Sequence, residues 1–127
     1  MPGTAAKVRV SEKQLAVLDK AVALSRVGGD LQLLGEMALL FLEEYPKTMA
    51  DVRVAVASRD PRGVERAAHN LKGSVGNFGA DAAYQAALTL EMCGRRNELD
   101  GVEAKLSELE EALEQLEPEL VELGENA

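Results

Sequence analysis

The chain contains one histidine, His69, and the residues around it predict an exposed imidazole. On an α-helix, the surface around a residue is formed by the residues three, four and seven positions away. Around His69 these positions include charged residues and glycines, namely Arg62, Glu65, Arg66, Lys72, Gly73 and Gly76. The opposite face of the same helix is apolar and carries Val64, Ala67, Ala68, Leu71, Val75 and Phe78. We therefore expect His69 to face solvent on a flat patch.

Three features of this patch suit a histidine that carries a phosphoryl group. An ordinary imidazole is largely neutral at cytosolic pH, so one ring nitrogen is available as a nucleophile. Lys72 lies one turn from His69 and is expected at the surface, where its ammonium can offset phosphoryl charge. Gly73 and Gly76 each cost a helix about 1 kcal/mol relative to alanine. Their presence on this face indicates that another protein approaches the backbone closely.

Other chemistries fit the sequence less well. A lone histidine is often an ordinary surface or core residue, but here the apolar face of the helix lies elsewhere. Structural zinc takes about four nitrogen or sulfur ligands, and the chain offers one histidine and one cysteine. No G-x-S-x-G motif supports a Ser-His-Asp hydrolase. Neither a Walker A motif nor a nucleotide-binding glycine loop is present, so we expect no use of ATP and no enzyme activity.

The run at residues 68–80, A-H-N-L-K-G-S-V-G-N-F-G-A, resembles the signature of histidine-containing phosphotransfer (HPt) domains. The likeness continues upstream in residues that resemble the entry turn, the second helix and the kink of the family, namely Gly28-Gly29-Asp30, Leu34, Phe41 and Pro46. Downstream, Leu90-Glu91-x-x-Gly94-Arg95 resembles the L-E-x-x-G-R segment of the family. The resemblance covers roughly residues 11–117.

The resemblance implies a phosphorelay intermediate. Such a domain would accept a phosphoryl group on His69 and exchange it with the aspartate of a response-regulator receiver domain. The chain itself would need no cofactor, because the receiver brings the Mg²⁺ ion. The implied partners are receiver domains and a hybrid sensor histidine kinase, and the chain could also be the C-terminal domain of such a kinase.

The resemblance also assigns roles to single residues. His69 would be the phosphorylation site, Lys72 would offset charge on the phosphoryl oxygens, and Glu91 stands where the family has a glutamine or glutamate that hydrogen-bonds the imidazole. The residues that would contact the partner, or leave room for it, are Arg66, Gly73, Gly76, Asn77 and Arg95.

A geometric argument also places Glu91 near His69. If two antiparallel helices are joined at Gly79, His69 lies about ten residues before the turn and Glu91 about twelve residues after it, so both sit at a similar height. Leu90 is expected to face the core, which leaves Glu91 at the seam between the helices. There it would accept the ring N–H, fix the tautomer and leave the other nitrogen free to attack. The alternative is that Glu91 is one of many surface acids.

Two other functions stay open at this point. One is the phospho-accepting domain of a chemotaxis-type histidine kinase, and the other is a docking module that carries no phosphoryl group. The presence of His69, Lys72 and Gly73 argues against the docking module. The runs Phe78-Gly79-Ala80 and Asp60-Pro61 look more like relay domains than like the chemotaxis type.

Composition and charge favour a small all-α protein. The chain has 127 residues, which suits one domain, and it is 46% hydrophobic but only 3% aromatic. Its formal net charge of −8 disfavours binding to nucleic acids or to anionic membranes. One cysteine excludes an internal disulfide, and neither a membrane-spanning stretch nor a signal peptide is visible. We therefore expect a cytoplasmic, monomeric protein.

The pattern of apolar residues and caps predicts an N-terminal helix that begins at Ser11, where Ser11 and Gln14 form a capping box. Its apolar face is expected to consist of Leu15, Leu18, Ala21 and Val22. A second helix is expected to follow the cap Asp30 and to be kinked or restarted at Pro46.

Three more helices are expected after the second. One begins at Asp60-Pro61 and runs to about Asn77, and the next covers residues 81–95. The last is capped by Asn97 and has an apolar heptad seam of Val102, Leu106, Leu109, Leu113, Leu116, Leu120 and Leu123. The seam is typical of a bundle helix, with a coiled-coil dimer as the alternative.

Together these elements predict an antiparallel four-helix bundle with an additional N-terminal helix. A helical repeat array is disfavoured because the sequence contains no repeat of fixed period. The expected organisation is a flexible N-terminal tail at residues 1–10, an HPt domain at 11–123 and a C-terminal tail at 124–127.

Overall fold

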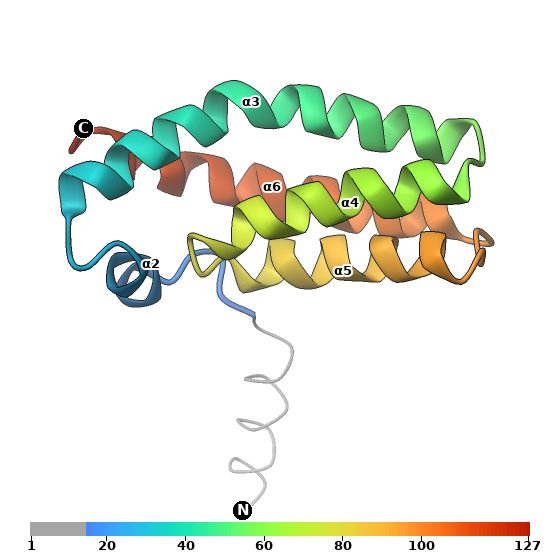
Figure 1. Ribbon diagram of the computed structural model, residues 1–127, viewed down its shortest axis with the longest axis horizontal. Helices are drawn as coiled ribbons and strands as arrows, with labels where there is room; N and C mark the ends of the chain where they lie inside the picture. Colours follow the sequence, from blue (N-terminus) through green and yellow to red (C-terminus); the bar gives the residue numbers. More distant parts are fainter. Residues whose placement is uncertain (1–14) are drawn as a thin grey trace, which may run out of the picture.

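The computed structural model of this protein describes residues 15–127, and the regular elements in that range are all α-helices. They are α2 (Lys20–Arg26), α3 (Leu31–Ala57), α4 (Pro61–Gly76), α5 (Asp81–Arg95) and α6 (Val102–Gly124). The four long helices form an antiparallel bundle, in which α3 and α5 each pack against α4 and α6, and α2 lies at one end (Figure 1). The predicted all-α bundle with an additional N-terminal helix is confirmed.

Helices α3 and α4 begin as the sequence predicts. The carboxylates of Asp30 and Asp60 accept hydrogen bonds from the backbone N–H groups of Leu33 and Gly63, at 3.0 and 3.1 Å. Pro61 follows as the first residue of α4. These caps satisfy N–H groups that the first turn of a helix leaves unpaired, and their negative charge favours the positive end of the helix dipole.

The N-terminal helix differs from the prediction. Its expected start at Ser11 lies outside the described residues, but residues 15–19 are not helical, and α2 begins at Lys20 after the cap Asp19. The expected apolar face is also wrong, since Ala23 is the buried residue of α2. The residues of that face that are exposed instead are Leu15, Ala21 and Val22.

Backbone hydrogen bonds explain why residues 15–19 are extended. The N–H of Asp19 donates to the carbonyl of Phe78 at 3.2 Å, and the N–H of Ala82 donates to the carbonyl of Ala16 at 3.0 Å. The segment is therefore paired with the turn between α4 and α5. Helical hydrogen bonds would require the same backbone groups, so tertiary pairing overrides the helical pattern of the side chains.

Two other boundaries differ from the expected ones. Helix α3 continues without a break through Pro46, so it is not restarted there. Asn97 does not cap α6, because its φ of +53° and its hydrogen bond to the carbonyl of Gly94 place it at the end of α5. Helix α6 begins at Val102, after Gly101, which has a φ of +74°. The sequence did not predict this start of α6, because the residues that follow α5 are held by hydrogen bonds to α5.

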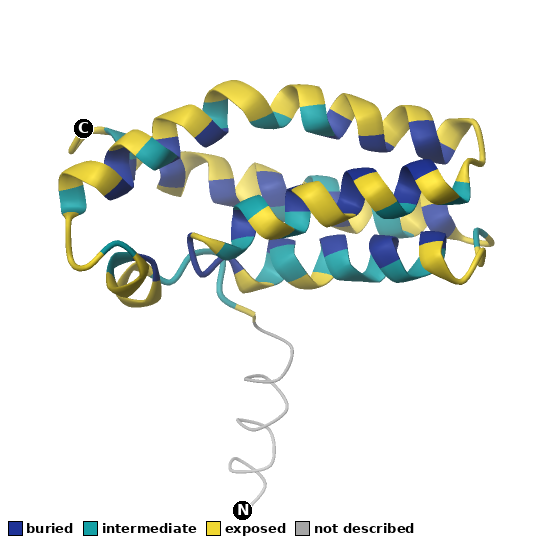
Figure 2. Ribbon diagram, viewed as in Figure 1, coloured by how far each residue is buried: buried dark blue, intermediate teal, exposed yellow. Residues whose placement is uncertain are grey.

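The core lies between the four long helices (Figure 2). The predicted apolar stripe of α4 is buried throughout, from Val64 to Phe78. The heptad seam of α6 is also buried, except for Leu106, which is half-buried. This seam therefore packs inside the chain as the fourth side of the bundle. None of the helices in residues 15–127 combines the length and the apolar character needed to cross a membrane.

The last residues of the chain lie against α3. A Cβ atom on Gly35 would be 2.6 Å from the carbonyl oxygen of Leu123 and 3.0 Å from the backbone nitrogen of Ala127. Real side chains do not approach backbone so closely, so a glycine on α3 makes room for the C-terminal end of the bundle.

Candidate functional site

His69 lies on the solvent face of α4, as the sequence predicts. Its side chain is 62% exposed, whereas its neighbours Ala68 and Leu71 are buried in the core. The apolar stripe fixes the rotation of α4 about its axis, because turning the helix would expose that stripe to water. Packing on the opposite face therefore holds the imidazole outward.

The backbones of α4 and α5 approach each other closely at Gly94. A Cβ atom on Gly94 would be 2.5 Å from the backbone nitrogen of Glu65 and 2.5 Å from the carbonyl oxygen of Pro61. At the other end of the pair, the turn between the helices contains Gly79, whose φ of +60° is a left-handed conformation that favours glycine. These two points fix the register of α5 on α4 and place Glu91 next to the imidazole.

The carboxylate of Glu91 contacts His69 directly. Its Oε2 atom is 2.9 Å from Nδ1 of the imidazole, and the Glu91 side chain is only 2% exposed. Because a carboxylate accepts hydrogen bonds, Nδ1 is the nitrogen that carries the proton and donates it. In the neutral ring, Nε2 is then unprotonated. The contact expected from the antiparallel geometry is present, and Glu91 is not a surface acid.

Two further cations surround the same carboxylate. Nζ of Lys72 is 2.8 Å from Oε1, a close ion pair whose geometry departs from that of a hydrogen bond, and Nη2 of Arg95 donates to Oε2 at 2.9 Å. Burial by itself raises the pKa of Glu91, but the contacts with Lys72 and His69, and their charges, outweigh it. The net effect is a pKa below the ordinary value of 4.5, so Glu91 is ionised at neutral pH.

Lys72 is more enclosed than the sequence suggests. Its side chain is 17% exposed, and Nζ is 5.9 Å from the centre of the Tyr84 ring, within the range of a cation–π contact. We expected a surface lysine, and the structure instead pairs its ammonium with Glu91. An ammonium has three N–H donors, so Lys72 retains donors for a second anion.

An open recess lies beside the imidazole and has a volume of about 480 Å³. It is lined by Arg62, Glu65, Arg66, His69, Glu91 and Arg95. Within residues 15–127, the guanidinium groups of Arg62 and Arg66 form no ion pair, and both residues are exposed. The recess therefore presents unneutralised positive charge next to His69, on a chain whose overall charge is negative.

Two of the glycines of α4, Gly73 and Gly76, have free space around them. A Cβ atom on Gly73 would meet no heavy atom within 4 Å, and one on Gly76 would lie 3.5 Å from Tyr84, which is ordinary contact. Packing within the chain therefore requires neither glycine. Asn77, at the end of α4, is exposed, while the Ser74 hydroxyl donates to the carbonyl of Asn70 within the helix.

Arg95 was expected to contact a partner, but the structure places it in contacts within the chain. Besides Glu91, it binds Glu65, with Nε donating to Oε2 at 2.9 Å. Sequence reasoning did not single out Glu65. The available signal was spacing, because Glu65 lies four residues before His69 and Glu91 lies four residues before Arg95. Two such pairs on antiparallel neighbouring helices bring four side chains together.

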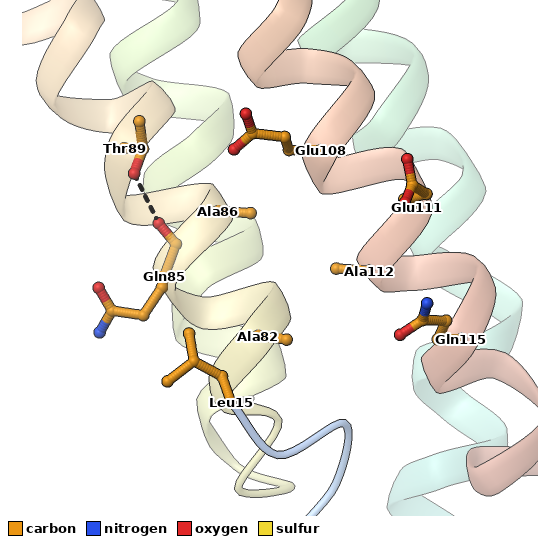
Figure 3. Close-up of a pocket in the computed structure, with 9 residues that line it drawn as sticks. All are labelled: Leu15, Ala82, Gln85, Ala86, Thr89, Glu108, Glu111, Ala112 and Gln115. Carbon is orange, nitrogen blue, oxygen red and sulfur yellow. Dashed lines mark hydrogen bonds between the residues drawn. The ribbon is translucent and has the colours of Figure 1, made fainter. Parts of the chain in front are cut away.

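A second groove, of about 460 Å³, lies between α5 and α6 (Figure 3). Its lining consists of alanines, amide and carboxylate side chains, Leu15 and Thr89. The Thr89 hydroxyl donates to the backbone carbonyl of Gln85 and is thus already used within α5. The residues that line this groove include neither an imidazole nor a thiol.

Known proteins resemble this chain in sequence and fold. The model of the Hpt domain family matches residues 36–119. The sensor protein TorS of Escherichia coli (strain K12) is 32% identical over 78 residues, which are 58% of this chain and 8% of TorS. The chain therefore spans a small part of that relative. The HPT domain of a Shewanella Hpt sensor hybrid histidine kinase superimposes with a TM-score of 0.77, at 19% identity, over 90% of this chain and 98% of that domain. At this identity the likeness shows a shared fold.

Proposed function

This chain belongs to the Hpt domain family, and from that premise we propose that it is a phosphorelay intermediate that carries a phosphoryl group on Nε2 of His69. The observation that supports this most directly is the 2.9 Å contact between Nδ1 of the exposed His69 and the buried carboxylate of Glu91. The contact assigns the proton to Nδ1 and leaves Nε2 with a free lone pair. A nucleophile must have such a lone pair and must be open to a second protein.

In the proposed step, the Nε2 lone pair attacks the phosphorus of an aspartyl phosphate on a receiver domain. A N–P bond forms and the P–O bond to the aspartate breaks, so the aspartate leaves as a carboxylate. Positive charge develops on the imidazole during the attack, and the negative charge of Glu91 beside Nδ1 stabilises it. The reverse transfer uses the same atoms, so net flow depends on which partner is phosphorylated.

Lys72 and the glycines have supporting roles in this proposal. Lys72 is one helical turn from His69 and can offer a remaining N–H donor to a phosphoryl oxygen while it stays near Glu91. Gly73 has open space in place of a side chain, which allows the receiver to approach the backbone of α4. We propose that Gly76 and Asn77 extend this docking surface towards the end of the helix.

We further propose that the partners are receiver domains, including that of a hybrid sensor histidine kinase. The positive charge of Arg62 and Arg66 suits the acidic side chains around a phosphorylatable aspartate. The Mg²⁺ ion would be held by the receiver, where it neutralises phosphoryl charge, and the chain itself would need no cofactor and no ATP. We propose that it acts as a cytoplasmic monomer, either alone or as the domain of a longer kinase.

The test is phosphotransfer from a receiver domain. A purified receiver is phosphorylated with a radiolabelled small-molecule phosphodonor, freed of the donor and incubated with the chain. The label should move to the chain, should be lost in acid and stable in alkali, and should be absent from H69Q. An acid-stable label, or a label that persists in H69Q, would contradict the proposal. Incubation with histidine kinase domains and ATP, without a receiver, tests the chemotaxis-type alternative.

A further inference from the structure

We propose that Glu65 and Arg95 are a positioning pair that orients the Glu91 carboxylate towards His69. The inference rests on the proposed function, because it concerns the nitrogen that takes up the phosphoryl group. It also revises the role of Arg95, which the sequence suggested as a contact for the partner. Neither residue would touch the phosphoryl group, and both would act through Glu91.

The four side chains form a rectangle across α4 and α5. Glu65 and His69 are four residues apart on one helix, and Glu91 and Arg95 are four residues apart on the other. Because the helices are antiparallel, Arg95 faces Glu65 at 2.9 Å while Glu91 faces His69 at 2.9 Å. A third contact of 2.9 Å, between Arg95 Nη2 and Glu91 Oε2, joins the two cross-links.

The contacts divide the two oxygens of Glu91 between different partners. Oε2 accepts from both His69 and Arg95, whereas Oε1 faces Lys72. Without Arg95, the ammonium of Lys72 would be the main cation in contact with the Glu91 carboxylate. Rotation about the Cγ–Cδ bond of Glu91 could then bring either carboxylate oxygen to Lys72. Arg95 removes this freedom, because its guanidinium holds Oε2 on the imidazole side.

Glu65 fixes the guanidinium in turn. Arg95 donates to Glu65 with Nε and to Glu91 with Nη2, so both donors belong to one rigid plane. A lysine at this position would be a point charge and could not hold both carboxylates in the same geometry. The close approach of backbone at Gly94 sets the distance between the pair, since one of the two atoms that would lie 2.5 Å from a Cβ at Gly94 is the backbone nitrogen of Glu65.

The chain contains a matched control for this pair. Arg53 on α3 and Glu110 on α6 form an ion pair through the same atoms, with Nε 2.6 Å from Oε2. The side-chain exposures are 52% and 32% for Arg53 and Glu110, and 53% and 35% for Arg95 and Glu65. Loss of Arg53 therefore removes an ion pair of the same exposure as the Arg95–Glu65 pair, while only Arg95 also contacts Glu91 and is thereby connected to His69.

The first measurement uses the free protein. Nitrogen-15 NMR of the imidazole reports which ring nitrogen carries the proton, without any phosphoryl group or partner. The wild-type chain and R53A should show the proton on Nδ1, and R95A should shift towards a mixture of the two tautomers. E65A should shift in the same direction by less, and E65Q should restore the wild-type spectrum because its amide oxygen still accepts from Arg95.

The second measurement is the single-turnover rate of transfer from a phosphorylated receiver, as a function of receiver concentration. R95A should lower the maximal rate by roughly tenfold, as is common for residues that orient a functional imidazole, with the half-saturating concentration unchanged. R53A should have the same maximal rate and the same half-saturating receiver concentration as the wild type. A change confined to the half-saturating concentration would make Arg95 a docking residue and would overturn the inference.

Two further results would also overturn it: a wild-type tautomer in R95A, or equal effects of R95A and R53A. If R95A does not fold, the comparison of E65A with E65Q tests the same orientation without changing Arg95. The outcome is separable from that of the proposed function. A wild-type chain that takes up no phosphoryl group contradicts the proposed function, whereas the tautomer measurement still decides whether Arg95 positions Glu91.

Discussion

At the scale of single residues, the site depends on the carboxylate of Glu91. Moving a charge out of water costs several kcal/mol unless partners compensate for it. Glu91 is 2% exposed and has three such partners, His69 and Lys72 from α4 and Arg95 from its own helix. One carboxylate therefore fixes the orientation of the imidazole and the location of the lysine together, and a change at this residue affects both.

Substitution of Glu91 should separate hydrogen bonding from charge. E91Q keeps a carbonyl oxygen that can accept from Nδ1, but it removes the charge that binds Lys72 and Arg95. E91A removes both, so we expect it to slow transfer to His69 by at least about tenfold, with E91Q in between. The measurement is the single-turnover transfer rate, with circular dichroism as the control for folding. Transfer by E91A at the wild-type rate would contradict the role of Glu91.

Replacement of Lys72 should affect stability as well as transfer. K72A removes the ammonium that is paired with the buried Oε1 of Glu91, and a buried charged group that loses a partner costs about 1–3 kcal/mol. We expect slower phosphorylation together with a loss of this size in urea unfolding. K105A, on α6 and away from the site, serves as the control. A loss of stability with unchanged transfer would mean that Lys72 has only a structural role.

The sequence was sufficient to place His69 and Glu91 but not to find their partners. Helical periodicity puts His69 outside, and the distance from the Gly79 turn brings Glu91 to its height. Periodicity does not show which way a long side chain turns. From the sequence, the Lys72 side chain could extend into solvent or fold towards α5. Its contacts with the buried carboxylate of Glu91 and with the Tyr84 ring favour the folded orientation. Arg95 likewise contacts the carboxylate of Glu91, although its side chain stays 53% exposed.

At the scale of helices, glycines serve two different purposes on α4 and α5. Gly94 lies where the backbones touch, since a Cβ atom would be 2.5 Å from backbone of α4. Gly73 lies where nothing is within 4 Å. The first glycine is required by packing and sets the register of the pair, while the second leaves a surface free. The sequence alone does not distinguish a glycine required by packing from one that leaves a surface free, because Gly94 and Gly73 both lie within predicted helices.

Replacement of Gly94 and of Gly73 by alanine should therefore have opposite effects on the free energy of unfolding. G94A forces α4 and α5 apart, and overpacking of this kind costs about 1–3 kcal/mol in the free energy of unfolding. G73A should keep the stability or raise it by up to about 1 kcal/mol. Urea unfolding of both variants measures the contrast. A stable G94A with an unchanged Glu91–His69 contact would show that the register does not depend on Gly94.

A larger side chain at Gly73 tests access rather than folding. G73L has room in the free protein, so it should fold with nearly wild-type stability, yet its side chain would occupy the surface on which the receiver docks. We expect strongly reduced transfer with normal unfolding. V54L, a change on the exposed face of α3, is the control for added apolar surface. Transfer by G73L at the normal rate would contradict the docking surface.

Helix boundaries were predicted correctly where a side-chain cap nearby in sequence determines them. They were predicted poorly where contacts with residues distant in sequence determine them. Asp30 and Asp60 cap their helices through their own side chains, so the sequence contains the signal. The start of α2 depends instead on backbone hydrogen bonds between residues 15–19 and the α4–α5 turn. Those partners are about sixty residues away in sequence, and no local pattern reports them.

At the scale of the whole molecule, charge is unevenly distributed. The chain has a net charge of −8, but the recess beside His69 is lined by three arginines. Two glutamates of α6, Glu108 and Glu111, line the groove between α5 and α6 (Figure 3). Acidic side chains on another protein would therefore be attracted to the recess beside His69.

The buried carboxylate also links the stability of the whole fold to pH. In the folded chain the pKa of Glu91 is below 4.5, and in the unfolded chain it returns to about that ordinary value. The folded state therefore binds the proton less readily than the unfolded state. The resulting stabilisation is fully present above the unfolded pKa and is lost as the pH falls through the folded pKa.

E91Q allows this contribution to be measured, because it has no titratable group at the position. The difference in free energy of unfolding between the wild type and E91Q should be present above the unfolded pKa of about 4.5, and should shrink as the pH falls below that value. Urea unfolding at a series of pH values gives the difference. E111Q, which changes an exposed glutamate of α6, controls for the loss of one negative charge. A difference that stays constant across the acid range would show that Glu91 is not held ionised by Lys72 and His69, and would remove the electrostatic basis for its action on the imidazole.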